Sequence, residues 1–218
     1  MSAGDYVAGD RRLADVPHTT DASGAYAVRR AVDRRYGRPA AFWGMIILIA
    51  SEATLFGAFI GTYYYLRFTH AVWPLPGDPK PKVVLPVILA GVLALTTIPM
   101  YLAWQAARAA RLGAARAFLC VALVVQLGYF AYEVHDFSDQ LHKTPITRDA
   151  YTSIYYTLLG ADHAHVLIGM LFVVWLLWKL AFGFTTYRVN ATQAIAWYWY
   201  FVNLLTLVVI GTLVSAAA

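Results

Sequence analysis

Five long apolar segments dominate this sequence, and each of them is long enough to cross a membrane. A bilayer core of about 30 Å needs roughly 20 apolar residues in a helix. Charged residues make up only 13% of the 218 residues, whereas soluble domains contain about 25%. No segment alternates as a barrel strand would, so each must satisfy its backbone as a helix. The sequence therefore predicts an all-α integral membrane bundle of five transmembrane helices, at residues 41–67, 83–106, 115–134, 151–181 and 192–215.

The segments between these apolar runs are predicted to be turns and loops. Residues 73–82 contain four prolines and cannot continue a helix. Residues 107–113 form a short basic turn, 135–149 a loop of mixed charge, and 183–190 a short loop. Residues 1–38 are polar and rich in Arg and Asp, and they are predicted to be a loosely structured cytoplasmic tail ahead of one membrane domain, residues 39–218.

The basic residues predict the orientation of the bundle. Twelve of the 17 Lys and Arg residues fall on the side of the N-terminus and five on the other side. Because basic residues are enriched on the cytoplasmic side, the N-terminus is predicted inside and the C-terminus outside. The net charge of +5 is scattered over membrane-flanking segments, so it does not indicate nucleic-acid binding.

Two acidic residues lie near the middle of predicted spans, Glu52 in the first and Asp162 in the fourth. A charge at this depth is unfavourable by roughly 2.5–3.5 kcal/mol, so such groups usually face protein or water. Helical spacing places Phe56, Phe59 and Tyr63 on one stripe with Glu52. For Glu52, a neutral buried carboxyl and a proton-handling group are both open interpretations.

Further polar residues form stripes on the other helices. The third span carries Gln126, Tyr129 and Glu133, the fourth Asp162 and His165, and the fifth Tyr200 and Asn203. These stripes are predicted to point into the bundle. Hydrogen bonding between helices is the simplest interpretation for Gln126, Tyr200 and Asn203.

The Asp162-His163-Ala164-His165 run has the composition of a metal-binding segment. Its two histidines are two residues apart, so on a helix they point about 200° apart and do not suit one ion. Asp162 and His165 have the i, i+3 spacing that suits a shared metal, but they supply only two ligands. A hydrogen-bonded pair of Asp162 with His165 is therefore favoured, with no metal, haem or catalytic residue on this chain.

Short motifs follow one another along the predicted helices. They are Trp43-Gly44-Met45 with Ser51-Glu52 and Phe56, then Gln126 with Tyr132-Glu133, then Gly160 with His165-Val166 and Gly169, and finally Tyr198-Trp199-Tyr200-Phe201-Val202-Asn203. In this order they resemble subunit III of the haem–copper oxidases, in its short five-helix form, over about residues 41–215. The sequence departs from the family pattern at four positions, where Asp162, His163, Tyr200 and Asn203 replace His, Gly, His and Asp.

The resemblance implies an accessory subunit of a bacterial cytochrome c or quinol oxidase in the cytoplasmic membrane. Such a subunit packs against subunit I, joins subunit II and other respiratory subunits, holds phospholipid and supports proton uptake, while haem and copper sit in the partner subunits. Glu52 matches the intramembrane carboxylate of the family. A polar cluster is expected from the other motif residues: Gln126, Tyr132, Glu133, Asp162, His165, Tyr200 and Asn203.

Two other functions remain open from the residues alone. A small proton-coupled transporter would use Glu52 and Asp162 as proton relays. A membrane metalloenzyme would use Asp162 and His165 as ligands.

Overall fold

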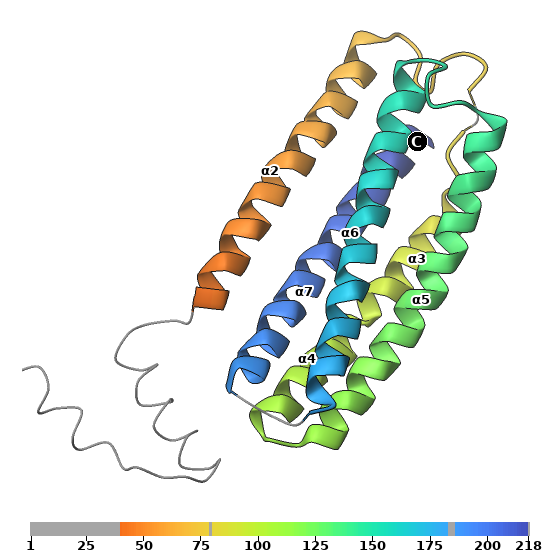
Figure 1. The fold of residues 1–218 in the computed structure, drawn as a ribbon. Helices are drawn as coiled ribbons and strands as arrows, with labels where there is room; N and C mark the ends of the chain where they lie inside the picture. The colour runs from red at the N-terminus through yellow and green to blue at the C-terminus, as the bar shows by residue number, and fades with distance from the viewer. Residues whose placement is uncertain (1–39, 79, 183–185, 218) are drawn as a thin grey trace, which may run out of the picture.

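The structure, a computed structural model, describes residues 40–78, 80–182 and 186–217, and this part of the chain is helical with no strand (Figure 1). The helices are α2 (Ala40–Thr69), α3 (Val84–Leu95), α4 (Thr97–Arg108), α5 (Leu112–Lys143), α6 (Ala150–Leu180) and α7 (Thr186–Val214), followed by the 3₁₀ turn η2 (Ser215–Ala217). Because α3 and α4 together make one span, these elements give five helices long and apolar enough to cross a membrane. The predicted all-α class with five spans is confirmed. The tail predicted at residues 1–38 lies outside the described residues.

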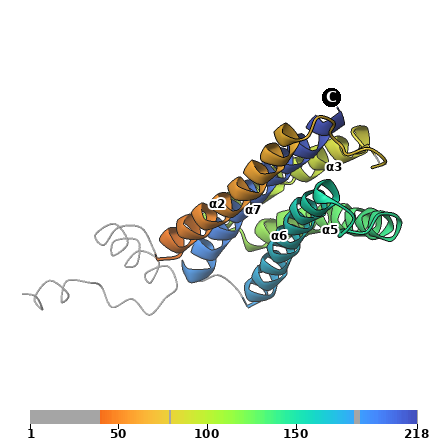
Figure 2. The same ribbon diagram turned by 90° about the horizontal axis from the view of Figure 1, so that it is seen from above.

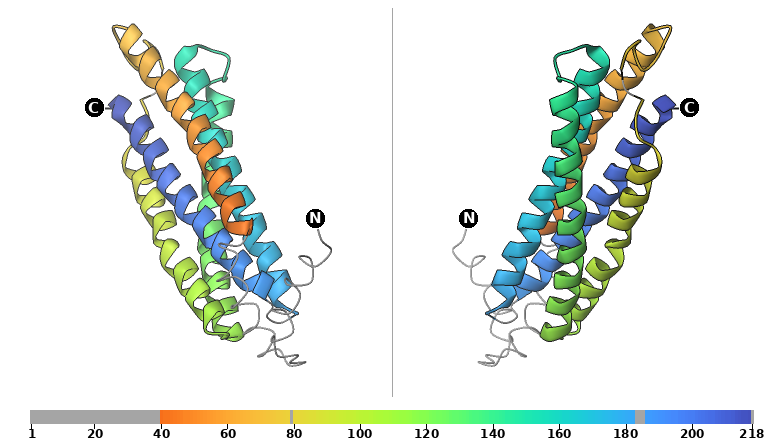
Figure 3. Two further views of the ribbon diagram at one scale, coloured as in Figure 1. Left: turned by 90° about the vertical axis from the view of Figure 1, so that its left-hand side faces the viewer. Right: turned by 90° about the vertical axis from the view of Figure 1, so that its right-hand side faces the viewer.

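The helices pack in two rows. Looking down the bundle, α2, α7 and α3 form one row, and α6 and α5 form the second (Figure 2). In the contacts between elements, α7 touches α2, α3, α4 and α6, while α6 touches α2, α5 and α7. The C-terminus lies at the same end of the bundle as the α2–α3 connection (Figure 3). The helix with the most neighbours, α7, therefore lies at the centre of the bundle, with α6 packed along it.

Burial differs strongly between the helices. In the most apolar window of α7, 56% of the residues are buried, against 11% in α2. Large apolar side chains such as Val84, Val124 and Phe68 stand exposed around the bundle. A soluble protein rarely exposes apolar surface on this scale, and in a bilayer this surface is satisfied by lipid or by other membrane helices.

The helix ends differ from the sequence prediction in three places. First, α5 continues to Lys143, through nine residues that were predicted to belong to a loop. Polar side chains one helical turn apart contact each other in this extension and stabilise it. The Gln140 amide donates to Asp136 at 2.5 Å, and His135 lies 3.6 Å from Asp139. Second, α7 begins at Thr186 rather than at residue 192. Third, the second span is interrupted at Thr96, three residues before Pro99, which lacks the N–H needed to continue the ladder.

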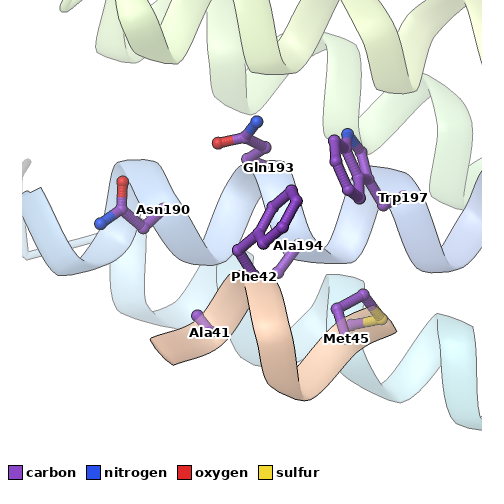
Figure 4. A pocket seen from close by; sticks show the side chains of 7 residues that line it. All are labelled: Ala41, Phe42, Met45, Asn190, Gln193, Ala194 and Trp197. Atoms are coloured by element: carbon purple, nitrogen blue, oxygen red, sulfur yellow. The ribbon is translucent and has the colours of Figure 1, made fainter. Parts of the chain in front are cut away.

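The end of the bundle where α2 begins is closed by contacts between α2 and α7. Figure 4 shows Phe42 of α2 pointing at α7, beside Gln193 and Trp197. The rings of Phe42 and Trp197 meet edge to face, with centroids 5.0 Å apart. This contact fixes α2 against the central helix at one end, while Arg67 donates to the Ser215 hydroxyl at 2.6 Å at the other.

Candidate functional site

The polar interior of the bundle is organised around α6. Three neighbouring residues of this helix, Asp162, His163 and His165, each face a different helix. Because residues on an α-helix are about 100° apart, consecutive polar residues are directed at different neighbours. His165 meets Glu52 on α2, His163 meets Glu133 on α5, and Asp162 meets Thr206 on α7. Three polar contacts therefore join α6 to its three neighbours α2, α5 and α7.

Glu52 and His165 are joined by a hydrogen bond between α2 and α6. His165 Nδ1 lies 2.7 Å from the carbonyl oxygen of Ala161, which can only accept, so Nδ1 carries a hydrogen. Glu52 Oε2 lies 2.9 Å from His165 Nε2. A hydrogen bond there requires either a protonated carboxyl beside a neutral ring or a carboxylate beside an imidazolium. Both forms contain the same number of protons and are neutral overall, which suits a site at membrane depth.

Aromatic groups fix the position of this pair. Phe56 packs edge to face on the His165 ring at a centroid distance of 5.1 Å, and the Tyr198 hydroxyl donates to the His165 carbonyl oxygen at 3.1 Å. The stripe predicted with Glu52 faces the interior, since Phe56 and Tyr63 are buried and Phe59 is half-buried. The Glu52 side chain itself is 23% exposed, so the pair borders the surface of the bundle that α2 forms.

A second acid–histidine pair lies on the opposite side of α6. His163 Nε2 is 3.4 Å from Glu133 Oε2, and both side chains are 8% exposed. His163 Nδ1 is buried without a hydrogen-bond partner among the described residues. Sequence reasoning assigned no role to His163. The signal that could have found it is Glu133, a carboxyl inside an apolar span that needs a partner on a neighbouring helix.

Asp162 is fully buried between the two pairs. Its Oδ1 accepts a hydrogen bond from the Thr206 hydroxyl at 2.8 Å, and its Oδ2 has no partner in the described part of the chain. The predicted Asp162–His165 hydrogen bond is wrong, because each side chain turns to a different neighbouring helix. Among the described residues no group of three or more His, Cys, Asp or Glu side chains converges as metal ligands.

The other predicted site residues divide into buried and exposed positions. The Asn203 amide donates to Thr97 Oγ1 at 2.7 Å, which ties α7 to the break in the second span. Gln126 is fully buried, and neither of its amide atoms has a partner in the described part of the chain; the Tyr200 hydroxyl is likewise unpartnered there. Tyr132 is 42% exposed on α5 and does not join the interior cluster.

The end of the bundle that holds the α2–α3 connection carries an ion-pair cluster. Arg148 donates to the Gly77 carbonyl oxygen at 2.9 Å and lies 3.3 Å from Asp78 and 3.7 Å from Asp149. Burial and the neighbouring Asp149 raise the pKa of Asp78. Burial opposes ionisation of Asp149 as well, but hydrogen bonds from Thr152 lower its pKa overall. A hydrogen bond to Asp136 raises the pKa of Lys82. These charges fasten the α2–α3 connection to the start of α6 and to α5.

The geometry of this cluster suits the holding of protons. The two pairs and Asp162 offer carboxyl and imidazole groups that are fixed by packing between helices, and the Asp162 carboxyl also accepts a hydrogen bond from the Thr206 hydroxyl.

Comparison with known proteins gives a consistent set of relatives. No family model matches the chain. Curated proteins named cytochrome c oxidase subunit 3 match from ostrich (Struthio camelus), 28% identical, and from mouse (Mus musculus), 26% identical, each over 76% of this chain. The chain spans 65% of the length of these two relatives. A protein of the same name from Bacillus subtilis is 26% identical over 74% of this chain and 79% of its own length.

Proposed function

Because the chain is a relative of the cytochrome c oxidase subunit 3 family, we propose that it is the accessory subunit III of a bacterial respiratory oxidase. In this function the complex reduces oxygen to water and translocates protons, while this chain carries no redox centre. It packs on subunit I alongside subunit II, holds phospholipid and supports proton uptake in the cytoplasmic membrane.

The observation that carries the proposal is the Glu52–His165 pair. Sequence resemblance singles out these two residues independently, in motifs that lie 113 residues apart in the chain. Their side chains meet at 2.9 Å. An intramembrane carboxylate beside a neutral imidazole carries one negative charge, and uptake of one proton makes the pair neutral.

The uncovered face of α2 supports a partner in the membrane. Gly57 and Gly61 are exposed on this face, and a Cβ atom added at either would meet nothing within 4 Å. Small residues four apart allow another transmembrane helix to approach closely. Glu52 points to α6, on the side of α2 away from Gly61, so a subunit I helix on this face would cover the outer side of α2.

The first test is purification of the tagged chain in a mild detergent, followed by a visible spectrum and identification of the bound proteins. We expect haem absorbance and a larger multi-span partner that carries the metal ligands. A colourless, homogeneous preparation of this chain alone would refute the subunit assignment.

The role of Glu52 has its own test in the purified complex. Glu52→Ala is expected to reduce protons pumped per electron, lipid retention and the number of turnovers before inactivation. Ser51→Ala is the matched control, since the exposed Ser51 hydroxyl bonds only to the Leu48 carbonyl oxygen. Equal pumping, lipid content and lifetime in Glu52→Ala and wild type would exclude this role.

A further inference from the structure

A sizeable cavity lies at the end of the bundle that holds the α2–α3 connection. It has a volume of about 290 Å³. Exposed charged residues stand around it, among them Lys80, Asp139 and Lys143. The first turns of α6 add Tyr151 and Tyr155 to its wall. A charged cavity of this size at the end of a membrane bundle is expected to be filled with water.

A second, smaller cavity lies next to the first. Five residues line both cavities: Pro81, Lys82, Asp136, Gln140 and Tyr155. The remaining wall of the smaller cavity is Glu133 together with aliphatic groups and one proline: Pro86, Leu159, Ile210, Leu213 and Val214. The two cavities are therefore neighbours, separated by the shared residues, and the smaller one borders Glu133.

The smaller cavity has the size and the chemistry to hold a water molecule. Its volume is about 20 Å³, and one water needs roughly 10–15 Å³ of such space with two to four polar partners. Glu133, Asp136, Gln140 and Tyr155 supply these partners. The 3.4 Å separation of Glu133 Oε2 from His163 Nε2 is long for a direct hydrogen bond, so a water bound at Glu133 would complete the hydrogen bonding of its carboxyl.

We propose that Glu133 and His163 form a proton-exchange site that water reaches from the end of the bundle holding the α2–α3 connection. A hydronium ion in the small cavity gives its proton to the Glu133 carboxylate and leaves as water, and the reverse step returns the proton. With one shared proton the pair is neutral. Loss of that proton leaves a carboxylate beside a neutral ring, and gain of another leaves a neutral carboxyl beside an imidazolium.

The charged and titratable neighbours of the pair come from several elements. On α5 they are Tyr129 and Asp136, and on α6 Tyr155 and Asp162. Lys82, from the segment before α3, pairs with Asp136 across the cavity. The part of α7 that lines the small cavity is aliphatic: Ile210, Leu213 and Val214. This site is separate from the Glu52–His165 pair, which faces α2, and it does not depend on the proposed oxidase assignment.

Hydrogen–deuterium exchange followed by infrared spectroscopy tests the site in the purified chain with whatever subunits accompany it. The carboxyl signal of Glu133 is assigned by subtracting the spectrum of Glu133→Gln; if that variant does not assemble, Glu133→Asp shifts the same band. In wild type, we expect the band to move to its deuterated position on mixing with heavy water and to change with bulk pH.

A plug in the small cavity makes the test specific to the water route. Val214→Phe fills the cavity, and exchange at Glu133 should become about tenfold slower, equivalent to about 1.4 kcal/mol of activation free energy. Val208→Phe adds the same ring to an exposed position of α7 outside the cavity and should exchange like wild type. A Glu133 band that does not exchange, or one that exchanges equally fast in Val214→Phe, would overturn the proposal.

Discussion

Single residues in the interior of this bundle are constrained mainly by their hydrogen-bond partners. His165 donates through Nδ1 to Ala161, so its Nε2 depends on Glu52. Glu52→Ala leaves this nitrogen half-buried without a partner, and the expected loss is about 1–3 kcal/mol of unfolding free energy. Glu52→Gln can still donate an amide hydrogen to His165 Nε2. It should therefore lose less than half of the unfolding free energy that Glu52→Ala loses. Thermal unfolding of the purified complex measures both.

A double-mutant comparison checks that this loss belongs to the pair. In a His165→Ala background, Glu52→Ala should lower the unfolding free energy much less than it does in wild type, because the partner of Glu52 is already gone. Equal losses in the two backgrounds would mean that Glu52 stabilises the bundle through some other contact.

Close packing makes Gly169 a second sensitive residue. A Cβ atom at this position would lie 2.8 Å from the Trp199 ring, and Trp199 is fully buried. Gly169→Ala is therefore expected to destabilise the protein by about 1–3 kcal/mol. Gly128→Ala adds the same methyl group where nothing lies within 4 Å and should be neutral or slightly stabilising. Similar melting temperatures for the two variants would contradict the packing of Trp199 on Gly169.

Residue patterns in the sequence predict which side of a helix faces inward, but not which partner it meets there. The spacing of Glu52, Phe56 and Tyr63 is sufficient to predict their shared face, because helical periodicity is local. The Glu52–His165 and Glu133–His163 contacts depend on how three helices are placed in space. Tyr132 was placed in the cluster by the family resemblance alone, but one residue's step around α5 separates the exposed Tyr132 from the buried Glu133.

At the scale of elements, the start of α6 is fixed by a capping box. The Thr152 backbone N–H donates to Asp149 Oδ1 at 2.8 Å, and the Asp149 N–H donates to the Thr152 hydroxyl at 3.2 Å. Asp149→Ala should reduce the unfolding free energy by about 0.5–2 kcal/mol. Asp149→Asn keeps an oxygen that accepts the Thr152 N–H, so it should lose less unfolding free energy than Asp149→Ala.

The pH dependence of this cap follows from the lowered pKa of Asp149. An acid with a lower pKa in the folded state stabilises that state above its unfolded pKa of about 4, and the contribution disappears as the pH falls through the folded pKa. The stability difference between wild type and Asp149→Ala should therefore narrow below about pH 4. A difference that stays constant down to pH values well below the folded pKa would show that ionisation of Asp149 plays no part.

The exposed face of α2 gives a prediction about assembly. Gly57→Leu and Gly61→Leu add bulk where the chain itself has open space, so the isolated chain should keep its stability. If a partner helix packs there, both variants should lose co-purifying subunits. Gly128→Leu, at an open position on α5, is the control. Full retention of partner subunits in both α2 variants would place the interface elsewhere.

The extents of the elements were partly predictable. Hydropathy is sufficient for the apolar part of each span, because lipid imposes a minimum length. Hydropathy does not predict the last nine residues of α5. There the helix continues through contacts one turn apart among His135, Asp136, Asp139 and Gln140. The break at Thr96 also escapes hydropathy, since apolar residues continue on both sides of the break and only Pro99 signals an interruption.

For the whole molecule, the orientation in the membrane depends on a segment outside the described bundle. Within residues 40–217, the two ends carry five Lys and Arg residues each. The predicted excess on the inner side comes entirely from seven arginines before residue 39. Five of these fall at residues 29–38, close enough to the first span to bias its insertion.

Thiol labelling in intact cells decides the orientation. The single cysteine, Cys120, is first replaced by Ser. His142→Cys, at the end of the bundle near the α2–α3 connection, should then react with a membrane-impermeant reagent in intact cells. Arg111→Cys, exposed in the turn before α5, should react only after permeabilisation. Replacing the arginines at 29–38 by Gln should produce a mixture of both patterns, because residues 40–217 carry five Lys and Arg residues at each end and Arg11 and Arg12 lie far from the first span. The reverse labelling of His142→Cys and Arg111→Cys in the otherwise native chain would invert the topology and turn the water-filled cavity toward the cytoplasm.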